Sequence, residues 1–205
     1  MAFAFLLAVL VLSPVRAQDG AAVAVVRDTS DRLLKVLRED HARLSGDRRA
    51  LMETVEEVLM PALDFSLTAR LALGRSGRTA TPEQLTRFEG LFSEMLLRTY
   101  TAPLLEYADN IHIGFPPPTP QEKSDRASVR TELLIGERPP VAVNYSMRLS
   151  DGHWRVYDVV IAGISAVITF RRDFAADIRK HGLDGFMDRL EAHIAELRRR
   201  DNASP

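Results

Sequence analysis

The sequence predicts an α+β fold in which helices come first, a run of antiparallel strands follows, and helices close the chain. In the first half, apolar residues recur at three- and four-residue spacing, which is typical of amphipathic helices. The chain then changes to apolar–polar alternation, the period of half-buried strands. Helical spacing returns after Gly163. Because the strands follow one another without helices between them, this order indicates α+β rather than βαβ units.

Three helices are expected in the first 80 residues. Leu33, Leu37 and Leu44 belong to one apolar face, which predicts a single helix over residues 21–44. A second helix, over 51–60, stops before a proline, and a third, over 65–74, is followed by a loop over 75–80.

A stronger helix start follows at Thr81. Thr81 is the predicted N-cap, Pro82 occupies the first helical position, and Gln84 completes a capping box. Pro103 is expected to kink or end this helix, because its nitrogen cannot donate a hydrogen bond and its ring crowds the preceding turn.

Four strands are expected in the alternating region. They cover residues 111–115, 127–135, 141–149 and 154–161, and Ser150-Asp151-Gly152 forms a hairpin turn between the last two. The last strand is apolar on both faces, so we expect it to be covered on both sides or to be central in the sheet. Two helices then follow, separated at His181-Gly182, where the glycine suits a C-terminal cap.

The N-terminus resembles a secretory signal peptide. Residues 1–12 are apolar throughout, and this run is too short to span a bilayer of about 30 Å as a helix. Val15-Arg16-Ala17 fits a small-x-small cleavage site. We therefore expect a signal peptide over 1–17 and a single α+β domain over 18–205. An uncleaved anchor or a buried N-terminal helix is the alternative.

Composition excludes several kinds of site. The 205 residues contain no cysteine, which excludes disulfides, thiolate metal sites and a cysteine nucleophile. The five histidines show no metal-ligand spacing. With 27 Lys and Arg against 28 Asp and Glu, the chain has no basic footprint for nucleic acid. Loss of residues 1–17 removes only Arg16 among charged residues, and the resulting net charge of −2 argues against strong electrostatic capture by anionic membranes.

Several motifs resemble the MlaC family of toluene-tolerance or phospholipid-binding proteins, and they occur in the family's order along nearly the whole mature chain. They are Asp64-Phe65, Leu73-Gly74-Arg75, Ala80-Thr81-Pro82-Glu83-Gln84, Arg98-Thr99-Tyr100, the stretch from Asp151 to Val159, Gly163-Ile164-Ser165, Phe170-Arg171-Arg172-Asp173-Phe174 and Gly182-Leu183-Asp184-Gly185-Phe186.

The resemblance implies a curved antiparallel sheet of about four strands wrapped by N- and C-terminal helices, similar to the NTF2-like type, around an apolar cavity. It implies a periplasmic carrier that moves phospholipid between the outer and inner membranes and so maintains outer-membrane lipid asymmetry. The expected partners are an inner-membrane ABC transporter complex and an outer-membrane lipoprotein complex, with phospholipid as cargo and no cofactor.

Such a carrier needs apolar walls for acyl chains, because each buried CH₂ contributes about 0.8 kcal/mol. Candidate wall residues lie on one face of the predicted sheet and on two helices. The sheet candidates are Val141, Val143, Tyr145, Met147, Tyr157, Val159 and Ile161, and the helix candidates are Phe65, Leu71, Phe92, Met95, Leu96 and Tyr100.

Other interpretations stay open at this stage. Periodicity does not distinguish a cavity wall from a packed core, so each candidate residue could simply fill the interior. Asp158 beside Tyr157 would suit an NTF2-like enzyme in which a buried carboxylate transfers a proton on a small hydrophobic substrate. A lipid-free adaptor in an envelope complex, or a carrier of a related lipid such as a hopanoid, is a further alternative.

Overall fold

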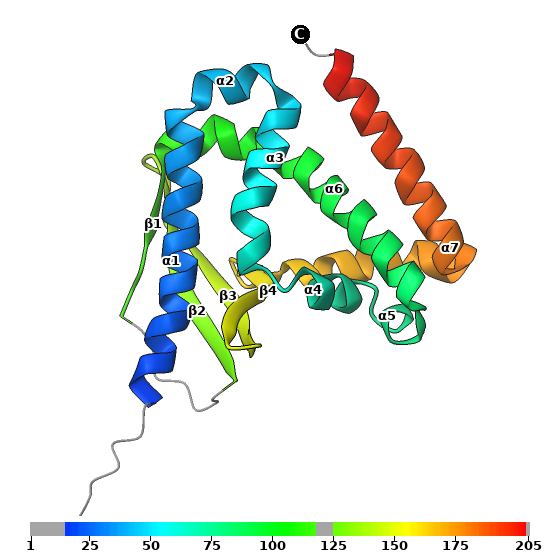
Figure 1. Ribbon diagram of the computed structural model, residues 1–205, viewed down its shortest axis with the longest axis horizontal. Coiled ribbons are helices and arrows are strands. Elements are labelled where there is room, and N and C mark those ends of the chain that lie inside the picture. Colours follow the sequence, from blue (N-terminus) through cyan, green and yellow to red (C-terminus); the bar gives the residue numbers. More distant parts are fainter. Residues whose placement is uncertain (1–14, 118–124, 204–205) are drawn as a thin grey trace, which may run out of the picture.

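The computed structural model describes residues 15–117 and 125–203 (Figure 1). Most of the predicted signal peptide, residues 1–14, lies outside this part, and its cleavage stays a prediction. In the part that is described, no helix is both long and apolar enough to cross a membrane.

The N-terminal helical region is broken once more than the sequence predicts. Helix α1 (Val15–Glu39) ends before Asp40, and a short helix α2 (His41–Gly46) follows. The prediction of one helix over 21–44 was therefore wrong. Asp40 has φ −101° and ψ 13°, and this departure from helical geometry redirects the chain. Leu44 stays fully buried because α2 folds it back onto the same helical core.

Helix α3 (Arg48–Leu59) begins at the side chain of Asp47, which accepts a hydrogen bond from the Ala50 N–H at 2.9 Å. The helix ends one residue before η1 (Met60–Ala62), a 3-10 turn that holds Pro61. The predicted stop before Pro61 is thus confirmed, since proline lacks the N–H that would continue the α-helical pattern.

Helix α4 (Phe65–Ala72) is capped by Asp64, whose carboxylate accepts from the Leu67 N–H at 3.1 Å. The loop predicted over 75–80 instead contains a helical turn, α5 (Ser76–Thr79). This turn packs closely on α4 at Gly77, where a Cβ would lie 2.2 Å from the carbonyl oxygen of Arg70. The close approach is a tertiary contact, which explains why local sequence did not indicate it.

Helix α6 (Pro82–Tyr107) starts with the predicted capping box between Thr81 and Gln84. Pro103 lies inside this helix and does not end it, contrary to one of the two outcomes expected. The residues after the proline are held by packing, because Leu105 and Ala108 are buried against α1 and α3. A 3-10 turn, η2 (Ala108–Asn110), then leads into the sheet.

The sheet has five antiparallel strands in sequential order β1-β2-β3-β4-β5. Its strands are β1 (Ile111–Gly114), β2 (Arg126–Ile135), β3 (Val141–Ser150), β4 (His153–Ile161) and β5 (Ile164–Ser165). The four predicted strands are all present, and β5 adds a two-residue strand beside the end of β4. The α+β class is therefore confirmed.

Helix α7 (Ala166–Ala203) closes the chain in two halves. Gly182, with φ 73° and ψ 175°, separates them at the predicted position. The second half turns back at this glycine and runs beside α6 (Figure 1), where Arg87 on α6 pairs with Asp188 and Glu191 on α7 at 2.7 and 2.8 Å.

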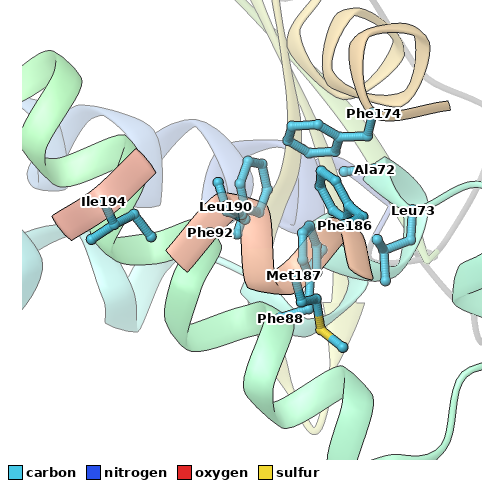
Figure 2. Close-up of a cluster of buried hydrophobic side chains, with 10 residues drawn as sticks. Ala72, Leu73, Phe88, Phe92, Phe174, Phe186, Met187, Leu190 and Ile194 are labelled. Carbon is cyan, nitrogen blue, oxygen red and sulfur yellow. The ribbon is translucent and has the colours of Figure 1, made fainter. Parts of the chain in front are cut away.

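Among the residues that the structure describes, the buried side chains form three clusters. The first joins α4, α6 and both halves of α7 around stacked and edge-on phenylalanine rings, and Figure 2 shows Phe88, Phe92, Phe174 and Phe186 at its centre. The second joins α1, α2, α3 and the end of α6. The third packs the first half of α1 against the sheet, with Ala22 and Val26 over strand residues such as Met147.

Candidate functional site

The face of the sheet that packs against α1, called here the inner face, is covered less completely at the end away from the β3–β4 hairpin. In β2 and β3, inward residues near the β3–β4 hairpin are buried, as Val129 and Met147 show. Towards the other end of the same strands, Leu133 and Val141 are only half-buried. The inner face therefore keeps apolar surface at the end farthest from the hairpin.

Four residues make up this apolar strip. Leu133 on β2 is opposite Val141 on β3, and Val143 on β3 is opposite Ile161 on β4. Directly opposed residues in antiparallel strands project to the same face, so their side chains form one continuous surface. Val143 is buried, whereas Ile161 is 48% exposed.

Sequence reasoning placed three of these four residues in the lipid-binding set and missed Leu133. Leu133 continues the alternation of Val129 and Thr131, so its face was predictable. Only the β2–β3 register, which pairs it with Val141, shows that it belongs to the uncovered end.

Tyr157 does not lie where a period of two places it. Ser146 is opposite Asp158 and Met147 is opposite Val156, so Tyr157 is the extra residue of a β-bulge. Its ring lies near Arg126, with the guanidinium carbon 5.8 Å from the ring centroid. Arg126 precedes the inward-facing Ala127 and projects to the opposite face. The prediction that Tyr157 shares a face with Val159 and Ile161 was therefore wrong, because the bulge shifts the alternation by one residue.

A buried polar pair interrupts the inner face beside the strip. The hydroxyl of Thr131, which is almost fully buried, donates to the Val143 carbonyl at 3.3 Å. Burial raises the pKa of Tyr145, and a hydrogen bond with Thr131 partly opposes this effect. The Tyr145 hydroxyl therefore has a polar partner, Thr131, inside the protein.

The helix candidates divide into packed and uncovered residues. Phe92 is fully buried, with its ring centroid 5.2 Å from Phe88 and 5.0 Å from Phe170. Phe65, Met95 and Leu96 are partly buried against the same cluster, and Leu71 is half-buried on α4. Tyr100 differs from all of them, because 56% of it is exposed on α6. Phe92 is accordingly core, while Tyr100 offers free aromatic surface.

Helix α4 is fixed to the sheet by a buried carboxylate. Asp64 is 7% exposed and forms an ion pair with Arg148 on β3, while its own N–H donates to the Val156 carbonyl at 2.8 Å. Thr68 adds a hydrogen bond from its hydroxyl to the Tyr157 carbonyl at 2.9 Å. These contacts hold the start of α4 at the edge of β4, and the Asp64 side chain reaches across to Arg148 on β3.

The Asp158 carboxylate is occupied at the start of α7. One oxygen accepts from the Ser165 hydroxyl at 2.6 Å and the other from the Val167 N–H at 3.1 Å. Ser165 in turn accepts from the Ile168 N–H at 3.0 Å. Asp158 thus serves as a helix cap, which accounts for a carboxylate at this place without a catalytic role.

Surface hollows elsewhere in the described part have mixed polar and apolar linings. A hollow of about 490 Å³ between α3, α4 and α6 includes Phe65, Met60 and Glu89 in its lining. Hollows of about 900, 390 and 290 Å³ contain none of the predicted lipid-binding residues. No group of three or more His, Asp or Glu among the described residues could hold a metal ion.

Three comparisons with known proteins agree with this architecture. Residues 27–192 match the family model described as MlaC protein. The toluene tolerance protein ttg2D of Pseudomonas putida is 29% identical over 184 residues, 88% of this chain and 85% of the relative. The intermembrane phospholipid transport system binding protein MlaC of Haemophilus influenzae is 19% identical over 195 residues, 94% of this chain and 91% of the relative.

A solved structure of a phospholipid-binding protein from Ralstonia solanacearum, in complex with a phospholipid, superposes with a TM-score of 0.78. It is 29% identical, and the match covers 86% of this chain and 98% of that one. Because the family model spans most of the sequence, the chain belongs to the MlaC family.

Proposed function

We propose that this chain binds a phospholipid and carries it between membranes. The observation that carries the proposal is the likeness to the Ralstonia solanacearum protein, which holds a phospholipid and matches almost over its full length at 29% identity. The cargo is a ligand in transit, so the proposed activity involves no chemical step and no cofactor.

The apolar strip is the proposed wall for acyl chains. Leu133, Val141 and Ile161 are apolar, adjacent and incompletely covered by the protein itself. Helix α6, which carries Tyr100, packs mainly against α2, α3, α4 and α7 rather than against the sheet. The strip and Tyr100 are therefore apolar surfaces on two separate layers that packing leaves free for a ligand.

The free energy of transferring an acyl chain into water determines how apolar this wall must be. An acyl chain of roughly sixteen carbons loses about 12 kcal/mol of transfer free energy if it enters water, at about 0.8 kcal/mol per CH₂. A carrier wall that stabilises the acyl chain nearly as much as the bilayer does lets the lipid both enter and leave. Half-buried aliphatic side chains meet this requirement better than charged ones would, which favours the strip over the hollows with mixed polar and apolar linings.

The proposed cellular location and partners follow from the proposed export. Residues 1–17 would be removed as a signal peptide, and the remaining chain would act in the periplasm. An outer-membrane lipoprotein complex and an inner-membrane ABC transporter complex are the proposed partners, and the proposed result is maintenance of outer-membrane lipid asymmetry. The name of the Haemophilus influenzae relative, a binding protein of an intermembrane phospholipid transport system, supports this setting.

Mass spectrometry of solvent extracts from the purified mature protein tests the cargo. We expect phospholipid to copurify and to exchange with labelled phospholipid from vesicles. The variant Leu133→Glu places a charge on the strip and is expected to lose most of the bound lipid. Its matched control is Leu134→Glu, the same substitution one residue further on the opposite face, which should retain lipid. If the native protein neither contains nor exchanges lipid, the proposal fails.

A further inference from the structure

An unusual set of exposed isoleucines surrounds the turn that joins β4 to α7. Ile161, Ile164 and Ile168 are 48%, 67% and 61% exposed. Ile161 and Ile164 are directly opposed between β4 and β5, so they share a face, and Ile168 lies in the first turn of α7. We call these three residues the isoleucine patch. Through Ile161 it continues directly into the apolar strip.

The backbone presents this patch outward. Ala162 and Gly163 connect the two strands with φ 49° and 83°, a left-handed pair that makes a tight hairpin. The Asp158 carboxylate beneath the turn holds Ser165 and the Val167 N–H, so the start of α7 is fixed relative to the hairpin. The isoleucines are therefore held in exposed positions by an ordered turn.

Positive charge gathers beside the patch. From residue 159 to 172 the chain has no acidic residue and ends with Arg171 and Arg172. From 65 to 81, which covers α4 and α5, it has three arginines and again no acidic residue: Arg70, Arg75 and Arg78. All five arginines are exposed.

Contacts bring these two stretches together. The Arg171 Nε donates to the Leu71 carbonyl at 2.9 Å, and its side chain packs against Gly74 at the end of α4. Asp173, the next residue on α7, places a carboxylate oxygen 3.5 Å from the Arg172 Nε. The chain as a whole is close to neutral, yet this corner is basic.

We propose that the isoleucine patch and its arginine rim contact the surface of an anionic phospholipid bilayer directly. Exposed aliphatic side chains beside a cluster of cations match the two layers of such a surface, acyl chains below and phosphate headgroups above. The patch also adjoins the strip, so a lipid could pass from bilayer to strip along apolar side chains. The inference locates membrane contact for the proposed carrier and in that sense rests on the proposed function.

Vesicle flotation of the mature, lipid-loaded protein tests the contact. We expect the protein to float with vesicles of phosphatidylcholine mixed with phosphatidylglycerol, and to do so less with phosphatidylcholine alone or at high salt, where charges are screened. The double variant Ile164→Thr with Ile168→Asp should bind about tenfold more weakly. Threonine preserves the strand preference, and aspartate suits the first turn of α7, so the fold should be retained. Arg75→Gln with Arg172→Gln should lower binding only to the anionic vesicles.

The matched control is Tyr107→Thr with Arg32→Gln, which removes an exposed aromatic residue and an exposed arginine from other surfaces. It should bind vesicles like the native protein. Absence of native binding, or native-like binding by the isoleucine variant, would overturn the proposal. So would an isoleucine variant whose only defect is in a partner complex or in self-association, because the patch would then be a protein interface. Lipid content measured in each sample separates this result from failure of the carrier function itself.

Discussion

The carboxylate of Asp64 caps helix α4 and at the same time forms an ion pair with Arg148 on β3. Asp64 is buried, whereas the Arg148 side chain is 38% exposed. One carboxylate therefore fixes both the start of a helix and its position on the sheet. This double role explains why an acidic side chain is kept at a buried position.

Replacing Asp64 with alanine should lower the free energy of unfolding by about 2 kcal/mol, since the cap is lost and the partly hydrated Arg148 is left unpaired. Urea unfolding measures the change. The matched control is Asp47→Ala, which removes an exposed cap of α3 without an ion pair and should cost about 1 kcal/mol. Equal losses in the two variants would show that the pair with Arg148 contributes nothing.

Glu94 predicts a pH-dependent contribution to stability. Hydrogen bonds from Arg198 lower the pKa of Glu94 below its ordinary value of 4.5, with a further contribution from Arg98, while partial burial opposes them. A depressed carboxyl pKa stabilises the fold above the unfolded-state value, and this stabilisation disappears as pH falls through the folded-state value.

The variant Glu94→Gln should therefore lose about 1 kcal/mol of unfolding free energy at neutral pH. The difference in unfolding free energy between the variant and the native protein should shrink as pH is lowered below 4.5, because the Glu94 carboxylate of the native protein then becomes protonated and loses its charge. Urea titrations at a series of pH values measure it. If this difference stays constant at acidic pH, the stabilisation does not come from the charged Glu94 carboxylate.

Two glycine substitutions should have opposite effects. In Gly77→Ala the new Cβ would meet the Arg70 carbonyl oxygen at 2.2 Å, so we expect a loss of roughly 1–3 kcal/mol from overpacking. In Gly90→Ala, inside α6, a Cβ meets nothing within 4 Å, so higher helix propensity should raise stability by about 0.8 kcal/mol. Thermal unfolding of both variants measures whether stability falls in Gly77→Ala and rises in Gly90→Ala. Unchanged stability in Gly77→Ala would mean that α5 does not pack closely against α4.

Alanine substitutions of Phe92 and Tyr100 should distinguish a residue that packs in the core from one that contacts the ligand. Phe92→Ala should lower the free energy of unfolding by about 3–5 kcal/mol, because it empties the centre of the phenylalanine cluster (Figure 2). Tyr100→Ala should change stability by about 0.5 kcal/mol or less, as expected for an exposed site, yet reduce the lipid that copurifies. Unchanged lipid content in Tyr100→Ala would remove this residue from the proposed site.

Much of the fold could be predicted because its signals are local. The capping box at Thr81, the cap at Asp64 and the break at Gly182 each depend on a side chain and the backbone within a few residues of it. The alternation in β2 and β3 likewise follows from the geometry of single strands. The order of helices and strands, and with it the fold class, was therefore determined by the sequence alone.

The candidate site could be predicted only in part. Val141, Val143 and Ile161 were expected from alternation, but the register that adds Leu133 and the bulge that removes Tyr157 both depend on a neighbouring strand. Sequence also could not distinguish the buried Phe92 from the exposed Tyr100, since both belong to one amphipathic helix.

Tertiary structure decided the remaining features, because each depends on how separate helices and strands pack against one another. Pro103 is tolerated inside α6 because packing holds the residues that follow it. The turn at Gly77 packs closely against α4 because glycine has no Cβ to clash with the Arg70 carbonyl oxygen. In the same way, α1 packs over the inner face near the hairpin, while Leu133 and Val141 at the other end stay only half-buried. The sequence by itself determined which residues are apolar and in which elements they lie, and only their packing decided which of them remain free to meet a lipid.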